Sequence, residues 1–258
     1  MTAYLGLNTK TVKLTGHDGD EIDAYVATPD GDGPFPGVLV IHHMPGWDEW
    51  STEVTRRFAH HGYQAICPNQ HHRQGEGTFE EIVGRVRGGG GNPDAQVVAD
   101  LQAGVDYLLG SSMSNGKVGI IGFCSGGRIS YMGAAKLNNI NAAVDCWGGN
   151  VLVPPGNIND SQPVAVFDMT AEIKVPLLGL FGNDDENPSP EHVNTIEAEL
   201  KKYAKDYDFH RYDGAGHGFF GWERNGYRQA QAADGWNKVF AFYEKHIGAG
   251  NLEAAGAK

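Results

Sequence analysis

A cysteine in the stretch GFCSG has the surroundings of a catalytic nucleophile. Residues 122–126 follow the pattern glycine, any residue, nucleophile, any residue, glycine, and they end the apolar run GKVGIIGF. This pattern is typical of a sharp strand-to-helix turn, which strains the backbone at its tip and needs small residues two positions before and after it. Centring the turn on Ser125 would put Phe123 at one of those positions, so we predict Cys124 as the nucleophile.

Ser125 follows the predicted tip. Its backbone N–H would stand at the start of a helix, where it could face a negatively charged oxygen that develops in a reaction. A free cysteine is more commonly a small buried core residue, so this motif needs support from the rest of the chain.

That support comes from an acid and a histidine further along the chain. In α/β-hydrolases the order is nucleophile, acid, histidine. Asp184 follows the apolar run VPLLGLFG, and His217 lies in the glycine-lined stretch DGAGHGF after the run YDFHRY. Each of the three residues comes at the end of a predicted strand, the edge at which open α/β sheets build sites. We predict Asp184 as the acid, with Asp185 as the alternative.

The elements that would hold these residues alternate between short apolar strands and amphipathic helices. We expect strands over 21–28, 37–43, 63–68, 116–122, 141–149, 175–185 and 207–214, and helices over 51–62, 93–110, 126–136, 189–203 and 227–248, with an irregular stretch over 69–93. The pattern predicts an α/β fold, a mostly parallel twisted sheet with helices on both faces. We expect one domain over residues 1–248 and a frayed tail over 249–258.

Composition excludes several classes of partner. The formal net charge of −12 would repel phosphate backbones and anionic membranes, so we expect neither nucleic acid nor a membrane as partner. The N-terminal residues lack the basic start and apolar middle of a signal peptide. The cysteines are few and odd in number, which favours a reducing cytoplasm over a disulfide framework; they are Cys67, Cys124 and Cys146.

At this point the chain resembles the dienelactone hydrolase family, the carboxymethylenebutenolidases. The matching stretches are GVLVIHHMPGWDEW, YQAICPNQHHRQ, NGKVGIIGFCSGGR, VPLLGLFGNDDENPSPE and GAGHGFF with the helix after it, and they span nearly the whole chain. The resemblance implies a single-domain α/β-hydrolase fold and hydrolysis of a small ester or lactone by a Cys-Asp-His triad, without a metal or organic cofactor. It places that triad on Cys124, Asp184 and His217, and the second oxyanion donor on the backbone N–H of Met44.

One position departs from the family pattern. Family members commonly carry a glutamate where this chain has His43, and that glutamate is implied in activating the thiol. His43 could form an imidazolium that stabilises a Cys124 thiolate, or it could line the pocket. Among candidates for the family's carboxylate-binding arginines, Arg73 matches best, and Arg85, Arg87 and Arg224 are nearby possibilities. The remaining substrate-binding candidates are Trp47, His72 and Phe219.

Other functions stay open at this stage. The pairs His42-His43 and His71-His72 could in principle hold a metal, but adjacent extended residues point in opposite directions, so we favour a polar rim around the substrate. The alternatives to a lactone hydrolase are a thioesterase or xenobiotic esterase of the same fold, and a non-catalytic binding protein with Cys124 as an oxidisable sensor. An oriented histidine argues against the sensor. We expect a monomer or a homodimer.

Overall fold

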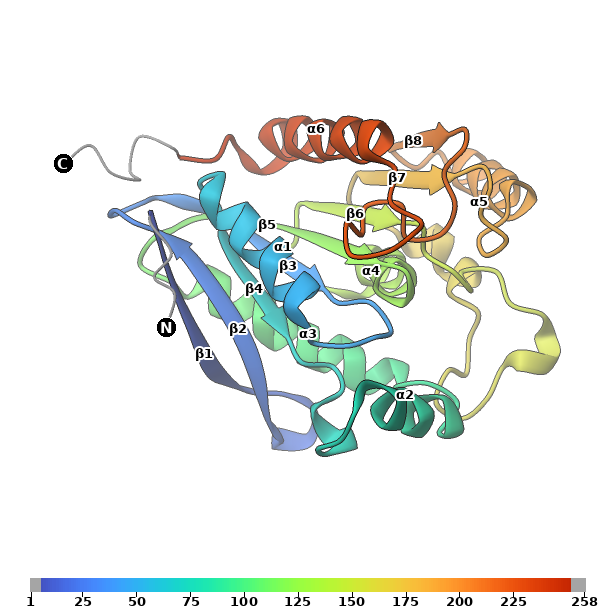
Figure 1. The fold of residues 1–258 in the computed structure, drawn as a ribbon, viewed down its shortest axis with the longest axis horizontal. Helices are drawn as coiled ribbons and strands as arrows, with labels where there is room; N and C mark the ends of the chain where they lie inside the picture. Colours follow the sequence, from blue (N-terminus) through green and yellow to red (C-terminus); the bar gives the residue numbers. More distant parts are fainter. Residues whose placement is uncertain (1–5, 252–258) are drawn as a thin grey trace.

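One eight-stranded sheet forms the centre of the molecule in a computed structural model, which describes residues 6–251 (Figure 1). Its strands are β1 (Leu7–Thr15), β2 (Glu21–Pro29), β3 (Phe35–Ile41), β4 (Gln64–Pro68), β5 (Ser114–Phe123), β6 (Ala142–Cys146), β7 (Leu177–Gly182) and β8 (Tyr207–Tyr212). They lie in the order β1-β2-β4-β3-β5-β6-β7-β8. β1 pairs antiparallel with β2, and β2 with β4; the other pairs are parallel. The α/β fold class predicted from the sequence is confirmed.

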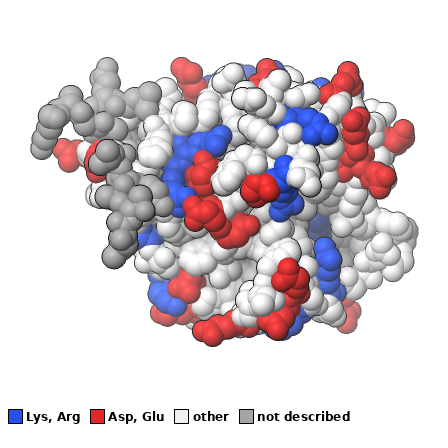
Figure 2. Space-filling view, in the orientation of Figure 1, with Lys and Arg blue, Asp and Glu red and all other residues white. Residues whose placement is uncertain are grey.

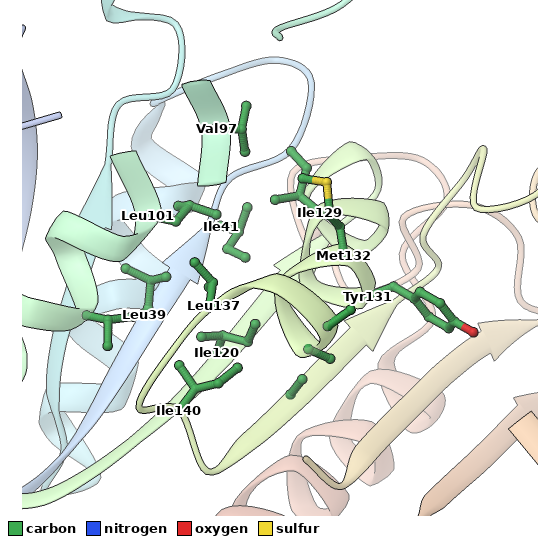
Figure 3. Packing of buried hydrophobic residues seen from close by; sticks show 14 of the residues in the cluster. Leu39, Ile41, Val97, Leu101, Ile120, Ile129, Tyr131, Met132, Leu137 and Ile140 are labelled. Atoms are coloured by element: carbon green, nitrogen blue, oxygen red, sulfur yellow. The ribbon is translucent and has the colours of Figure 1, made fainter. Parts of the chain in front are cut away.

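Helices cover both faces of this sheet because neighbouring strand residues point to opposite sides. The α-helices are α1 (Glu49–His60), α2 (Phe79–Gly88), α3 (Asp94–Leu109), α4 (Ser125–Lys136), α5 (Pro190–Lys202) and α6 (Gln229–Ile247). On one face, Leu39 and Ile41 of β3 pack with α3 and α4 (Figure 3). On the other face, Val38 and Val40 pack in one cluster with residues of α1 and α6.

Two elements were missed by the sequence prediction. β1 is a mostly exposed edge strand, so it lacks the apolar alternation that marks a half-buried strand. α2 lies inside the stretch 69–93 that was predicted to be irregular. A capping box begins this helix: Thr78 Oγ1 accepts from the N–H of Glu81, and the Glu81 carboxylate accepts from the N–H of Thr78.

The expected boundaries are tested only in part. Residues 252–258 of the expected tail lie outside the described residues. Just before them, the N–H of Asn251 donates to the Gly62 carbonyl at 3.0 Å, which ties this residue to the end of α1; the frayed tail over 249–258 stays a prediction. One domain over 1–248 stays a prediction, which the single sheet supports.

The face of the molecule shown in Figure 2 has no dominant basic patch. Acidic and basic side chains are interspersed there. None of the helices within residues 6–251 combines the length and apolar character that crossing a membrane requires.

Candidate active site

The predicted nucleophile turn joins β5 to α4. Cys124 stands between the two elements with φ 57° and ψ −117°, a left-handed backbone that is strained for a residue with a side chain. A Cβ atom on Gly122 would collide with the carbonyl oxygen of Gly126, and one on Gly126 would collide with that of Ile41. The glycines of the motif are therefore required by backbone crowding between β5, α4 and β3, as the pattern predicted.

Three groups that acyl transfer needs lie close enough to the Cys124 sulfur to lower its pKa. They are the ring of His217 and the backbone N–H groups of Ser125 and Met44. Ser125 is the first residue of α4, and Met44 lies in the loop after β3. The turn thus places one thiol beside a base and beside two N–H donors from separate elements. Met44, Cys124, Ser125 and His217, the four residues expected here from the sequence, therefore lie close together.

The acid beside His217 is Asp185, not Asp184. Asp185 Oδ2 lies 2.8 Å from His217 Nδ1, and Asp185 Oδ1 accepts from the N–H of Asn187 at 2.9 Å. Asp185 is 5% exposed, whereas Asp184 is exposed and holds the loop through its backbone N–H, which donates to the Ala215 carbonyl. The sequence assignment of Asp184 was wrong by one residue, because the turn after β7 directs only the second carboxylate inward.

The contacts of Cys124 and His217 shift their pKa values in opposite directions. Burial by itself would raise the pKa of the Cys124 thiol, but the hydrogen bond and positive charge of His217, with the two N–H groups, outweigh it and lower that pKa. Burial would likewise lower the pKa of His217. Its hydrogen bonds with Asp185 and Cys124 outweigh burial and raise the pKa to about 10. Together these shifts favour a resting thiolate–imidazolium pair.

His43 contacts an arginine and an aspartate. Its Nε2 lies 2.7 Å from Asp48 Oδ2, and its Nδ1 lies 3.2 Å from Nη2 of Arg224. A guanidinium has no acceptor, so Nδ1 must accept from Arg224, and Nε2 then carries the proton donated to Asp48. This tautomer is neutral. The arrangement favours a His43 that orients Arg224 over one that supplies an imidazolium to Cys124.

Two hollows meet at Cys124 and His217. The larger one, which we call the cleft, is open to solvent; besides Cys124 and His217 its lining includes Met44, Arg87, Arg128, Asn150 and Asn187. The smaller one is a narrow cavity that brings His43, Trp50, Trp147 and Arg224 to the same two residues. The cleft is therefore the side on which a substrate has room beside Cys124.

Sequence reasoning missed the two asparagines of the cleft. The side chain of Asn187 donates to Asn150 Oδ1 at 3.1 Å, while its N–H bonds to Asp185, so it links the acid to the cleft wall. Both lie in loops without periodicity, and no motif marks them. Their position after β6 and β7, at the same sheet edge as Cys124, was the available signal.

Four expected substrate-binding residues have other partners in the structure, so the geometry does not support them as substrate ligands. Arg73 is tied to Asp100 and Asp20 at 2.6 Å each. His72 Nδ1 lies 3.4 Å from Asp23 Oδ2. Trp47 Nε1 donates to the Cys67 carbonyl, and Phe219 is fully buried among aromatic rings. These side chains satisfy charges or fill the core.

Arg224 lines the small cavity with Cys124 and His217, while Arg87 and Arg128 line the cleft with the same two residues. Arg85 donates to the Glu76 carbonyl at 2.9 Å and lies on the exposed side of α2. Within residues 6–251, no group of three or more His, Cys, Asp or Glu side chains is arranged to hold a metal ion.

Comparison with known proteins agrees with this geometry. The pattern of the dienelactone hydrolase family matches residues 22–247. The chain belongs to the dienelactone hydrolase family. Its membership confirms the resemblance drawn from the sequence, and with it the predicted hydrolase class.

Three of the similar proteins illustrate the range of this family. A "putative carboxymethylenebutenolidase" of Methylorubrum extorquens is 34% identical over 93% of this chain and 82% of its own. A "probable 2-oxo-3-(5-oxofuran-2-ylidene)propanoate lactonase" of Bradyrhizobium is 27% identical over 90% of this chain and 92% of its own. The crystal structure of a "putative dienelactone hydrolase" from Klebsiella pneumoniae superposes with a TM-score of 0.82 at 30% identity, covering 93% and 99% of the two chains.

Proposed function

We propose that this protein hydrolyses small carboxylic esters or lactones through a covalent acyl-enzyme on Cys124. The observation that carries the proposal is the environment of the sulfur: His217 and the N–H groups of Met44 and Ser125 line the same cleft and lower the pKa of the thiol. A core cysteine has no need of these partners. Cys67 and Cys146 are fully buried, and burial raises both of their thiol pKa values.

In the first half-reaction the Cys124 thiolate attacks the carbonyl carbon of the substrate. The carbonyl oxygen becomes negatively charged and takes the hydrogen bonds of the Met44 and Ser125 N–H groups. The intermediate then collapses, the ester C–O bond breaks, and imidazolium His217 gives its proton to the departing oxygen. A thioester on Cys124 and a neutral His217 remain.

In the second half-reaction His217 accepts a proton from water, whose oxygen attacks the thioester carbonyl. The C–S bond breaks and releases the acid product, and the thiolate–imidazolium pair is restored. Asp185 keeps the His217 ring oriented and stabilises its charged form in both steps. A thiolate suits enol-type leaving groups, which depart readily, and this favours esters and lactones over amides.

The arginines around the sulfur favour a substrate that bears a carboxylate. Arg224 lines the small cavity with Cys124, and its guanidinium is held by His43 and Glu223. A lactone with a carboxylate arm, as the name of the Bradyrhizobium relative describes, would suit this side of the site. A reduced thiol is essential to the mechanism, so we also propose a cytoplasmic location.

The test is ester hydrolysis by variants of Cys124. Cys124→Ala should lower kcat/KM for p-nitrophenyl acetate by about 10⁴-fold or more with the fold retained. Cys124→Ser should retain weak activity at best, because a hydroxyl needs stronger base assistance than a thiol does. Near wild-type turnover by Cys124→Ala would refute the proposal, and Cys67→Ala provides a matched control that should stay active.

A further inference from the structure

A narrow hollow beside the oxyanion donors is lined by polar side chains that have no use in the mechanism above. Met44 and Ser125 line it together with polar side chains from several segments of the chain. We call it the polar chamber and define it by Gln70, His71, Asn92 and Arg128, which are 2%, 6%, 9% and 6% exposed.

Each of these four side chains has an atom without a hydrogen-bond partner. In the described part of the chain, eight buried side-chain nitrogens or oxygens lack partners, and four of them belong to this one cavity: Gln70 Nε2, His71 Nδ1, Asn92 Oδ1 and Arg128 Nε. Leaving such a group unpaired costs on the order of 1–3 kcal/mol. Their gathering in one place would give a small polar group in the cavity hydrogen-bond partners on several sides.

The chamber carries no unbalanced charge. The Arg128 guanidinium forms a two-fold hydrogen bond with Asp94, at 2.9 and 3.1 Å. His42 donates from Nδ1 to the His43 carbonyl and accepts the Gln70 N–H at Nε2, which fixes it as neutral. Burial lowers the pKa of His71 to about 4, so it too is neutral at physiological pH. A charged ligand group would find no counterion here.

The free atoms match the requirements of a hydroxyl. Gln70 Nε2 and Arg128 Nε are donors, and Asn92 Oδ1 is an acceptor. A hydroxyl accepts two hydrogen bonds and donates one, whereas a carbonyl oxygen only accepts and would leave Asn92 unsatisfied.

The chamber adjoins the cleft at the two oxyanion donors, and its lining does not include the base. It shares Met44, Ser125, Arg128 and Gln162 with the cleft that contains Cys124, but His217 lines only the cleft and the small cavity. The leaving group must lie near His217, which protonates it. The acyl portion of the substrate is therefore the part that can reach the chamber.

We infer that the polar chamber is an acyl-side subsite that binds an uncharged hydroxyl of the substrate through Gln70, Asn92 and Arg128. This inference rests on the proposed ester hydrolysis and names its substrate class: esters or lactones whose acyl portion carries a further, free hydroxyl. It accounts for three of the four buried polar atoms that the triad, the oxyanion donors and Arg224 leave unexplained; the fourth is His71 Nδ1.

The test compares paired substrates. The substrates are p-nitrophenyl esters of straight-chain acids of several lengths, each prepared with and without a terminal hydroxyl. At one chain length, kcat/KM for the hydroxylated ester should exceed that for the plain ester about tenfold or more. Gln70→Leu, which keeps the size but removes the donor, should lower this preference about tenfold. Gln64→Leu is the matched control, because Gln64 is also buried and has one unpaired amide atom but lies at the start of β4; the preference should survive in it.

Each outcome decides the question. No preference at any chain length in the wild type, or a preference unchanged by Gln70→Leu, would overturn the subsite and leave a cavity that holds water only. If Gln70→Leu does not fold, Asn92→Ala provides the same comparison by removing the acceptor. Turnover of plain esters that depends on Cys124 but shows no hydroxyl preference would leave the proposed function intact, so the two failures can be told apart.

Discussion

The Cys124 thiol and the His217 ring set the pH range in which the site is reactive. The lowered thiol pKa keeps the thiolate present below the pH at which a free cysteine ionises, and the raised His217 pKa keeps the imidazolium present up to about pH 10. We therefore expect iodoacetamide to alkylate Cys124 at a lower pH than a free thiol of pKa about 8.5. In His217→Ala the alkylation profile should move to higher pH.

His43 provides the control for this experiment. Because its Nδ1 accepts from Arg224, it holds no charge that would stabilise the thiolate. The alkylation profile of His43→Ala should coincide with that of the wild type. A profile displaced upward, as far as that of His217→Ala, would show that His43 is protonated beside the sulfur after all.

Asp184 and Asp185 are neighbouring carboxylates, so the same substitution in each tests which one is the acid that supports His217. Asp185→Asn should lower kcat by about 10²- to 10⁴-fold, because His217 loses the partner that orients its ring and stabilises its charge. Asp184→Asn should leave kcat within about twofold of the wild type, since its side chain is exposed. The reverse result, loss in Asp184→Asn alone, would mean that the loop is arranged differently in solution.

These residues also show what sequence could and could not predict. The backbone crowding around Gly122 and Gly126 is local, so the motif sufficed to locate Cys124. The choice between Asp184 and Asp185 depends on the direction of two neighbouring side chains in a turn, which no pattern records. Arg73 was misassigned because its partners, Asp20 and Asp100, are distant in sequence.

At the scale of elements, β6 carries a buried acid that makes stability depend on pH. Asp145 is 1% exposed; its Oδ1 accepts from the Gly148 N–H, and burial raises its pKa to about 7. In the unfolded chain the value is about 3.9, so the folded state binds more protons between those two pH values. The free energy of unfolding attributable to Asp145 should fall as pH rises from about 4 to 7 and level off above that.

Thermal unfolding of Asp145→Asn measures this effect. Asparagine keeps an acceptor for Gly148 and cannot ionise, so the Tm of the variant relative to the wild type should be higher at pH 8 than at pH 5. Asp184→Asn, on the exposed side of a loop, serves as the control and should show no such change. A difference between Asp145→Asn and wild type that stays constant with pH would contradict the assigned burial.

Elements with a strong apolar pattern were predicted well, and the exceptions have physical reasons. β3, β5 and β7 are almost wholly apolar where they cross the sheet, so their sequence alone marks them. β1 is exposed along most of its length and owes its place to pairing with β2. α2 is short and its stretch is rich in glycine, so the capping box at Thr78 was its main signal.

At the scale of the whole molecule, the parallel sheet explains why residues far apart in the chain meet. Met44, Cys124, Asp185 and His217 follow β3, β5, β7 and β8, and the carboxyl ends of parallel strands share one edge. Strand order could therefore be used to predict the site. The polar chamber could not be predicted in this way, because loop residues such as Gln70 and Asn92 reach it only through the packing of α3 and α4 on the sheet.

The central claim is that the Cys124 sulfur carries the acyl group. Its most direct test is mass spectrometry of wild-type protein mixed with excess p-nitrophenyl acetate and quenched in acid within the first turnovers. We predict a gain of one acetyl group, located by peptide fragmentation on Cys124 and missing from Cys124→Ala. An acetyl group on Ser125, or ester turnover in which Cys124 is never acylated, would contradict the account.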